Sequence, residues 1–142
     1  MPRKLSEEEL KLIRESGYSE KAIVLYMNNV NVGKLENPSV TTTFLGPCGD
    51  IIKLYLKINE KNVIEDAKFH YLGCPGSASS ASAMTVLLKG KNVNQAKKVE
   101  ESDIMLKLGG LPKSKRDCTT LSIKTLQKAI AEYEKMKGLS DI

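Results

Sequence analysis

The sequence predicts an α+β domain, because its strand-like and helix-like segments are grouped along the chain rather than alternating. In the middle third, three consecutive segments change from a helical period to a period of two, and short connections join them. Helical patterns precede and follow these segments. The length of 142 residues and the 41% share of hydrophobic residues fit one domain with a core of its own.

Three strands are predicted, at residues 40–44, 50–59 and 65–73. The first segment is rich in β-branched and aromatic residues. In the second, isoleucine and leucine alternate with lysine and tyrosine, which is the pattern of a strand with one buried face. The polar turn 59–62 leads directly into the third segment. Because antiparallel strands can be joined by such short connections, we expect a three-stranded antiparallel meander.

Six helices are predicted around this sheet. Ser6 and Glu9 match a capping box, and Ser19 suits the N-cap position of the second helix. The last helix begins near Asp117 or Cys118 and carries apolar residues at spacings of three and four. The predicted helical segments are 6–15, 19–27, 77–89, 94–99, 102–108 and the segment from 117 onward.

The charge balance does not indicate a nucleic acid partner. The chain has 22 basic and 17 acidic residues, a net charge of +5, but the two signs are interleaved and only 5% of the residues are aromatic. A surface that binds nucleic acid concentrates its basic residues and often supplies aromatic side chains for base stacking. We therefore expect no nucleic acid partner.

The apolar segments are too short for a membrane span. The longest uninterrupted run, Ala22–Met27, falls far below the roughly 20 residues that cross a bilayer. The N-terminal segment contains Glu7, Glu8 and Glu9 and lacks the apolar stretch of a secretory signal. A cytoplasmic protein without membrane contact is therefore predicted.

The three cysteines lie at predicted element boundaries. Cys48 lies in the tight turn between the first two strands, Cys74 directly precedes a helix, and Cys118 opens the last helix. Their odd number and wide separation argue against a disulfide framework and against the paired cysteines of a zinc ribbon. Helix N-termini and nearby cations stabilise a thiolate, which is the form that ligates metals and transfers sulfur.

Three interpretations of the cysteines follow from the residues alone. With the carboxylate of Asp50, the three thiolates would make a four-ligand set that selects zinc, cuprous copper or an iron–sulfur cluster. A single catalytic cysteine is the second interpretation, and structural cysteines in the core are the third. His70 is the only histidine. We expect it to be an exposed strand residue, with metal ligation as the alternative.

Several short motifs match one known family in their order along the chain. The matching residues are Tyr18–Lys21, Asn31–Gly33, Cys48–Asp50, Ile64–Phe69, Gly73–Cys74, Ser77–Thr85, Lys89–Gly90, Leu111–Pro112, Lys115 and Cys118. With these motifs, the chain from Tyr18 to about Lys137 resembles the U-type iron–sulfur cluster assembly scaffolds, which are IscU, SufU and the N-terminal domain of NifU. All three cysteines and Asp50 fall within the matching motifs.

The resemblance implies a fold of the SufE/NifU-like type, with a three-stranded antiparallel sheet and helices packed on one side. It implies a single iron–sulfur scaffold domain over residues 17–142. Residues 1–16 precede this domain as an N-terminal extension, which we expect to form a short helix. The resemblance further implies a scaffold or carrier protein and not an enzyme.

The resemblance also implies what the site holds. Cys48, Asp50, Cys74 and Cys118 would surround a labile 2Fe–2S cluster, built from iron and from persulfide sulfur that a cysteine desulfurase supplies. The cluster would then pass to apo-proteins. Cys118 matches the family's third cysteine on its mobile loop and is the expected persulfide acceptor. The alternative is a zinc-bound sulfur acceptor of the SufU kind, with Zn2+ or Fe2+ at the same site.

The segment before the third cysteine departs from the family. Asp117 stands where many IscU proteins carry histidine, and it is either a second carboxylate ligand or a helix cap. Lys113, Lys115 and Arg116 are expected either to dock the desulfurase or to form a solvated loop. The segment 111–115 keeps the lysine that an Hsp70-type chaperone reads in this family but lacks the second proline. Monomer and homodimer are both compatible with the sequence.

Overall fold

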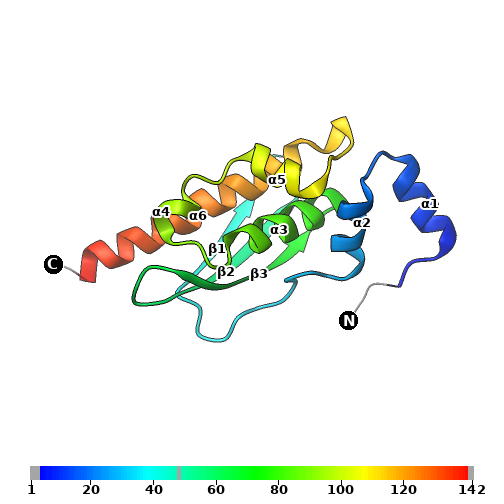
Figure 1. The fold of residues 1–142 in the computed structure, drawn as a ribbon. Helices are drawn as coiled ribbons and strands as arrows, with labels where there is room; N and C mark the ends of the chain where they lie inside the picture. The colour runs from blue at the N-terminus through cyan, green and yellow to red at the C-terminus, as the bar shows by residue number, and fades with distance from the viewer. Residues whose placement is uncertain (1–3, 48, 141–142) are drawn as a thin grey trace.

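The computed structural model describes residues 4–47 and 49–140. Figure 1 shows a three-stranded sheet with the helices α3 and α6 lying along it. The strands β1 (Val40–Leu45), β2 (Ile51–Ile58) and β3 (Ile64–Leu72) are antiparallel and lie in the order β1-β2-β3. The predicted meander and the predicted α+β class are confirmed.

One face of the sheet is buried beneath the helices. Leu54 of β2 lies opposite Thr42 of β1 and Phe69 of β3, and all three side chains are buried. They alternate along their strands with exposed residues such as Thr43 and Lys53. Because successive side chains of a strand point to opposite faces, this alternation assigns one face of the sheet to the core.

The helices begin and end close to their predicted positions. α3 (Pro75–Leu88) starts two residues earlier than predicted, because the fixed φ of proline suits the first turn of a helix. α4 (Val93–Ala96) is shorter than predicted, because the chain after it tightens into hydrogen bonds between residues three apart. The remaining helices are α1 (Glu7–Glu15), α2 (Glu20–Met27), α5 (Glu101–Leu108), the 3-10 helix η1 (Lys113–Lys115) and α6 (Asp117–Ser140). Among these described helices, none has the length and apolar content that crossing a bilayer requires.

α3 lies at the centre of the helical layer. It contacts α2, α5, α6 and β3, and every residue from Gly76 to Thr85 is buried. Apart from Met84, these ten positions hold only glycine, alanine, serine and threonine, which let neighbouring backbones approach closely. Several of their hydroxyls have partners nearby, as when Ser82 Oγ donates to the carbonyl of Val30 at 2.8 Å. Packing in the core therefore fixes the position of α3 and of the side chains in its first turn.

α1 lies at the edge of this core: none of its residues is buried, and Leu10 and Ile13 pack against the core as partly buried side chains. The residues that follow α1 contact the end of α5 and the segment between α5 and α6. A Cβ at Gly17 would lie 3.6 Å from Cγ of Pro112. The hydroxyl of Ser19 donates a hydrogen bond to the carbonyl of Leu108 and accepts one from the backbone of Ala22. The stretch between α1 and α2 is thus held more firmly to the folded body than α1, which contributes only partly buried side chains.

Candidate metal centre

Three side chains with ligand atoms converge where β2 begins, β3 ends and two helices start. The antiparallel register pairs Ile51 with Leu72, so Asp50 lies beside the residues that follow β3. Cys74 takes the N-cap position of α3, and Cys118 lies in the first turn of α6. The prediction that the cysteines lie at element boundaries is confirmed for these two.

The ligand atoms of Asp50, Cys74 and Cys118 all lie within 4.8 Å of one another. The Sγ of Cys74 is 3.8 Å from Oδ2 of Asp50 and 3.8 Å from the Sγ of Cys118. Cys118 is only 6% exposed, whereas Cys74 and Asp50 are half-buried. Two sulfur atoms and a carboxylate oxygen at this spacing can bind one metal ion or part of a metal–sulfur cluster.

Two glycines make room for the ligand atoms. A Cβ at Gly73 would lie 2.8 Å from Cγ and Oδ2 of Asp50. A Cβ at Gly76 would lie 3.0 Å from the Sγ of Cys118. A larger residue at the first position would displace the carboxylate, and one at the second would press on the thiol. The absence of a side chain at both positions therefore preserves the spacing of the ligands.

The hydroxyl of Ser77 lies among the three ligands. It donates a hydrogen bond to Oδ2 of Asp50 and lies 3.7 Å from the Sγ atoms of Cys74 and Cys118. Ser77 is fully buried in the first turn of α3. From the sequence, Ser77 was expected only to begin a helix and a family motif, and these contacts were not predicted. One feature of the sequence could have indicated them. Ser77 lies three residues after Cys74, and the side chain at that position of a helix lies beside its N-cap residue.

One proton is shared between the two described thiols. The Cys118 thiol donates a hydrogen bond to Cys74, which lowers the pKa of Cys74 to about 5, while burial acts in the opposite direction. Hydrogen bonds from Ser77 and from the backbone of Gly76, at the start of α3, lower this pKa further. The same hydrogen bond, together with burial, raises the pKa of Cys118. The hydrogen bond between the two sulfurs therefore favours the thiolate at Cys74 and the thiol at Cys118.

Tyr18 bounds the site from the chain that precedes α2. It is 9% exposed, and among the described residues its hydroxyl has no hydrogen-bond partner. Burial, and then the charge of the nearby cysteines, raises the pKa of Tyr18 and keeps its hydroxyl protonated. This hydroxyl lies 3.3 Å from the point where a Cβ at Gly76 would stand, close to the Sγ of Cys118. A sulfur atom of a bound cluster would give the buried donor an acceptor, so the pocket fits a metal–sulfur group.

Other predicted site residues lie outside this group of ligands. Cys48 lies outside the described residues. Asp117 is exposed in the first turn of α6, where an acidic side chain stabilises the helix N-terminus, and the described ligand group does not include it. His70 is exposed on β3 with its ring 5.8 Å from that of Tyr55, as expected of an exposed strand residue.

The basic residues beside Cys118 lie around η1. Lys113 and Arg116 are exposed, and Lys115 is half-buried. The Cβ of Lys115 is 3.3 Å from the point where a Cβ at Gly76 would stand. The segment is therefore a short helical turn that lies against the metal centre with two of its charges toward solvent.

This fold and its clustered ligands define a class of protein that handles a metal ion or a metal–sulfur group. Residues 17–139 match the family model described as the NifU-like N terminal domain. The chain belongs to this family, and the resemblance noted in the sequence is confirmed.

Named relatives share most of the chain. The sequence is 38% identical over 126 residues to the iron-sulfur cluster assembly scaffold protein IscU of Azotobacter vinelandii, covering 86% of this chain and 98% of that protein. It is also 38% identical to IscU of Escherichia coli K12 over 121 residues, covering 82% and 94%. Identity to IscU 1 of Archaeoglobus fulgidus is 37% over 125 residues, covering 87% and 81%.

Solved structures share the fold. The N-terminal part of a nitrogen-fixing NifU-like protein from Brucella abortus gives a TM-score of 0.68 at 18% identity, covering 87% of this chain and 98% of that one. A putative iron–sulfur cluster assembly scaffold protein for the SUF system from Fervidobacterium islandicum gives 0.65 at 24% identity, covering 80% and 96%. These likenesses bear on the fold, and they confirm the predicted SufE/NifU-like architecture.

The shared proton predicts how Cys74 reacts. In the chelator-treated protein, the rate of iodoacetamide labelling of Cys74 should rise with pH through a midpoint near 5. Cys118→Ala removes the hydrogen-bond donor, so the midpoint should move upward by about one pH unit or more. Cys118→Ser keeps an O–H donor and should move it less. Mass spectrometry of the peptide that contains Cys74 measures the rate, and an unchanged midpoint in Cys118→Ala would contradict the shared proton.

Proposed function

We propose that this protein is a scaffold on which a labile 2Fe–2S cluster is assembled and from which it is transferred to apo-proteins. The observation that carries the proposal is the convergence of the Asp50 carboxylate and the sulfurs of Cys74 and Cys118 within 4.8 Å. Membership of the NifU-like family and identity to relatives named IscU support it. The cluster is a cargo rather than a resident cofactor, and residues 17–142 form the domain that carries it.

Three thiolates and one carboxylate hold the cargo in this proposal. Cys74 and Cys118 supply two sulfur donors and Asp50 supplies an oxygen donor. Cys48, two residues before Asp50 in the sequence, supplies the third sulfur. Thiolates suit iron–sulfur clusters, whereas a carboxylate is a harder donor that water or an incoming thiol exchanges more readily. One weak ligand among four retains the cluster during assembly and offers a position at which release begins.

Sulfur reaches the site as the persulfide of a cysteine desulfurase, and Cys118 accepts it. The Cys118 sulfur attacks the outer sulfur of that persulfide, the S–S bond breaks, and the desulfurase cysteine leaves as a thiolate. In the closed site the hydrogen bond to Cys74, 3.8 Å away, holds Cys118 as the thiol, so this bond breaks and Cys118 gives its proton to water before it attacks. Because Cys118 is only 6% exposed, the segment that contains η1 moves aside when the desulfurase docks.

The basic residues Lys113, Lys115 and Arg116 dock the desulfurase. They adjoin the acceptor thiol in sequence and space, and within the described part of the chain none of them forms an ion pair. Unpaired surface charges beside a reactive group steer a partner of opposite charge toward it. The partner surface that fits is therefore acidic and surrounds the persulfide.

The zinc-bound sulfur acceptor uses the same ligands and differs in what the site carries. A scaffold reconstituted anaerobically with iron, sulfide and thiol turns brown and shows charge-transfer absorption, with iron and sulfide in equal amounts. A sulfur acceptor copurifies with zinc and stimulates a desulfurase without holding a cluster. A thiol enzyme loses activity on alkylation and binds no stoichiometric metal. Metal and sulfide analysis of the purified and the reconstituted protein separates the three.

Serine in place of a site cysteine should prevent stable cluster assembly, because a hydroxyl replaces a thiolate poorly on iron. We expect Cys48→Ser, Cys74→Ser and Cys118→Ser each to retain less than about a tenth of the wild-type cluster after reconstitution. Charge-transfer absorbance and bound sulfide measure the yield, and circular dichroism checks that each variant is folded. Wild-type yields in all three variants would contradict a shared site.

Alanine at position 50 should slow cluster release. Asp50→Ala removes the exchangeable ligand, so the cluster that forms on the thiolates should transfer to an apo-ferredoxin at least about threefold more slowly. Absorbance follows the transfer from the reconstituted protein. Glu65→Ala removes an exposed carboxylate of β3 and serves as the matched control, with transfer at the wild-type rate, while Asp117→Ala tests the alternative carboxylate ligand. Equal or faster transfer from Asp50→Ala would show that lability has another origin.

Charge reversal beside the acceptor should slow sulfur transfer. In the double variant Lys115→Glu, Arg116→Glu, persulfide formation on Cys118 should slow by about tenfold at low ionic strength and depend less on salt. Mass spectrometry after mixing with desulfurase and cysteine detects the persulfide. The control is Lys57→Glu, Lys61→Glu, at exposed positions on and beside β2, which should behave as wild type. An unchanged rate of persulfide formation in Lys115→Glu, Arg116→Glu would show that the basic segment is a solvated turn without a docking role. Persulfide found on Cys48 alone would make Cys48, and not Cys118, the acceptor.

A further inference from the structure

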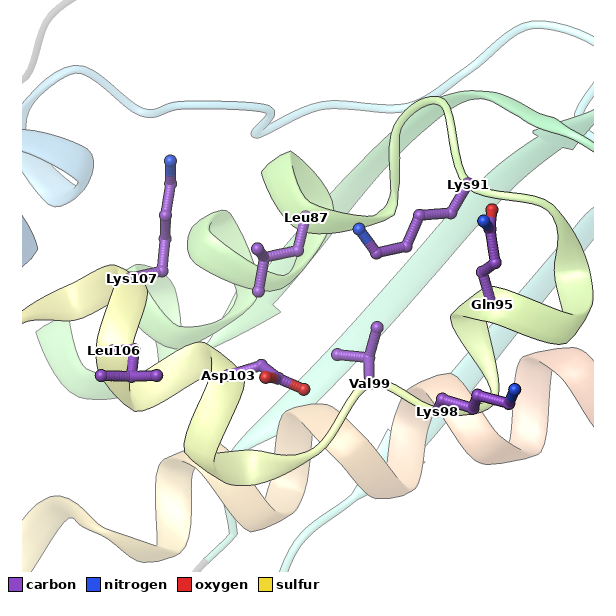
Figure 2. A pocket seen from close by; sticks show the side chains of 8 residues that line it. All are labelled: Leu87, Lys91, Gln95, Lys98, Val99, Asp103, Leu106 and Lys107. Atoms are coloured by element: carbon purple, nitrogen blue, oxygen red, sulfur yellow. The ribbon is translucent and has the colours of Figure 1, made fainter.

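A hollow in the helical layer shares none of its lining residues with the metal centre. It lies between α3, α4 and α5 and has a volume of about 520 Å³. Figure 2 shows the side chains of Leu87 and Val99 facing each other across it, with the carboxylate of Asp103 beside them and Lys91, Lys98 and Lys107 at the edges. The hollow therefore combines an apolar interior with a basic edge.

A second hollow of about 470 Å³ adjoins the first, because Leu106 and Lys107 line both. Val24 and Leu25 of α2 form its apolar part. Leu106 is 77% exposed and Val24 is 53% exposed. Leu106 is thus a ridge with an apolar hollow on each side. We call this surface the lysine-rimmed groove, and its rim carries Lys21, Lys91, Lys98 and Lys107.

The charge of the lysine-rimmed groove is positive and unbalanced. Within residues 4–47 and 49–140, none of its four lysines forms an ion pair. The two acidic residues that line the groove already have partners. Glu20 accepts a hydrogen bond from Arg14 at 2.7 Å, and Asp103 accepts the backbone N–H of Glu100 at 2.8 Å. The groove therefore presents four free ammonium groups around exposed apolar carbon.

We propose that the lysine-rimmed groove docks an acidic amphipathic helix of a partner protein. An apolar patch within a polar rim marks an interaction surface, and a ridge between two hollows is the relief that a packed helix fits. Apolar side chains three and four residues apart on such a helix enter the hollows on either side of Leu106. Its glutamate and aspartate side chains then reach the four lysines.

The shape of the groove favours this occupant over two others that a basic surface attracts. A lipid surface takes up apolar side chains that project from a convex face, whereas here the apolar area lies in two hollows. A nucleic acid would contact the lysines through its phosphates and leave the apolar floor without a partner. A helix with an apolar stripe and acidic flanks uses both features.

The test uses the full chain and a synthetic probe. The probe is a fluorescein-labelled helical peptide of about four turns, with leucine on one face and glutamate on the others. One twin carries lysine in place of glutamate, and a second carries serine in place of leucine. Fluorescence anisotropy should show that the acidic amphipathic peptide binds, that salt weakens it, and that both twins bind at least about tenfold more weakly.

Two groove variants and two controls locate the binding. Leu106→Ser and Lys107→Glu should each weaken peptide binding by about tenfold. Leu12→Ser changes a 59% exposed leucine of α1, Lys57→Glu changes an exposed lysine of β2, and both should bind as wild type. Reconstitution of the cluster should be unchanged in the groove variants, so this result is independent of the proposed scaffold function.

Several results would overturn the proposal. One is absence of peptide binding by the wild type, and another is equal binding by the groove variants. A preference for anionic phosphatidylserine vesicles or for a single-stranded RNA over the peptide would assign the groove to a membrane or to RNA. Sedimentation that reveals a dimer of the wild type, lost in Leu106→Ser, would assign it to a second copy of this chain.

Discussion

The register between β2 and β3 is the constraint on which the metal centre depends. Because Ile51 pairs with Leu72, the carboxylate of Asp50 comes level with the chain that leaves β3, 3.8 Å from the sulfur of Cys74. A slip of one residue would turn every side chain of the strand to the opposite face and bury lysine where leucine now lies. The apolar residues that fix this register therefore also fix the ligand spacing.

The second requirement is a helix whose first turn does not move. α3 is surrounded by the sheet and three helices, and it carries Cys74 at its N-cap and Ser77 in its first turn. With Gly73 and Gly76 leaving space, the ligand atoms of Asp50, Cys74 and Cys118 lie within 4.8 Å of one another. A preorganised site loses little side-chain freedom on binding. If such a site releases its cargo readily, the cause lies in the chemistry of its donors and not in loose geometry.

Features with a local repeating pattern could be predicted from the sequence. Contacts between segments that are distant along the chain could not. Alternation with a period of two located the strands, and capping residues such as Ser19 located helix starts. Cys74 and Cys118 are 44 positions apart, and their proximity came from the family resemblance, since no spacing rule connects them. The contacts of Ser77 and the unpaired hydroxyl of Tyr18 were missed because each arises where three elements meet, which local pattern does not encode.

The stretch between α1 and α2 has a consequence for access to the thiol of Cys118. Gly17 lies close to Pro112, and the hydroxyl of Ser19 donates a hydrogen bond to the carbonyl of Leu108 at the end of α5. The chain before α2 therefore lies against the segment that leads to Cys118. That segment cannot swing outward without breaking these contacts or drawing residues 17–19 with it. Movement of the segment before Cys118 and movement of residues 17–19 are therefore thermodynamically coupled, and the coupling acts in both directions. The exposure of Cys118 is therefore tied to contacts made by residues far from it in the sequence.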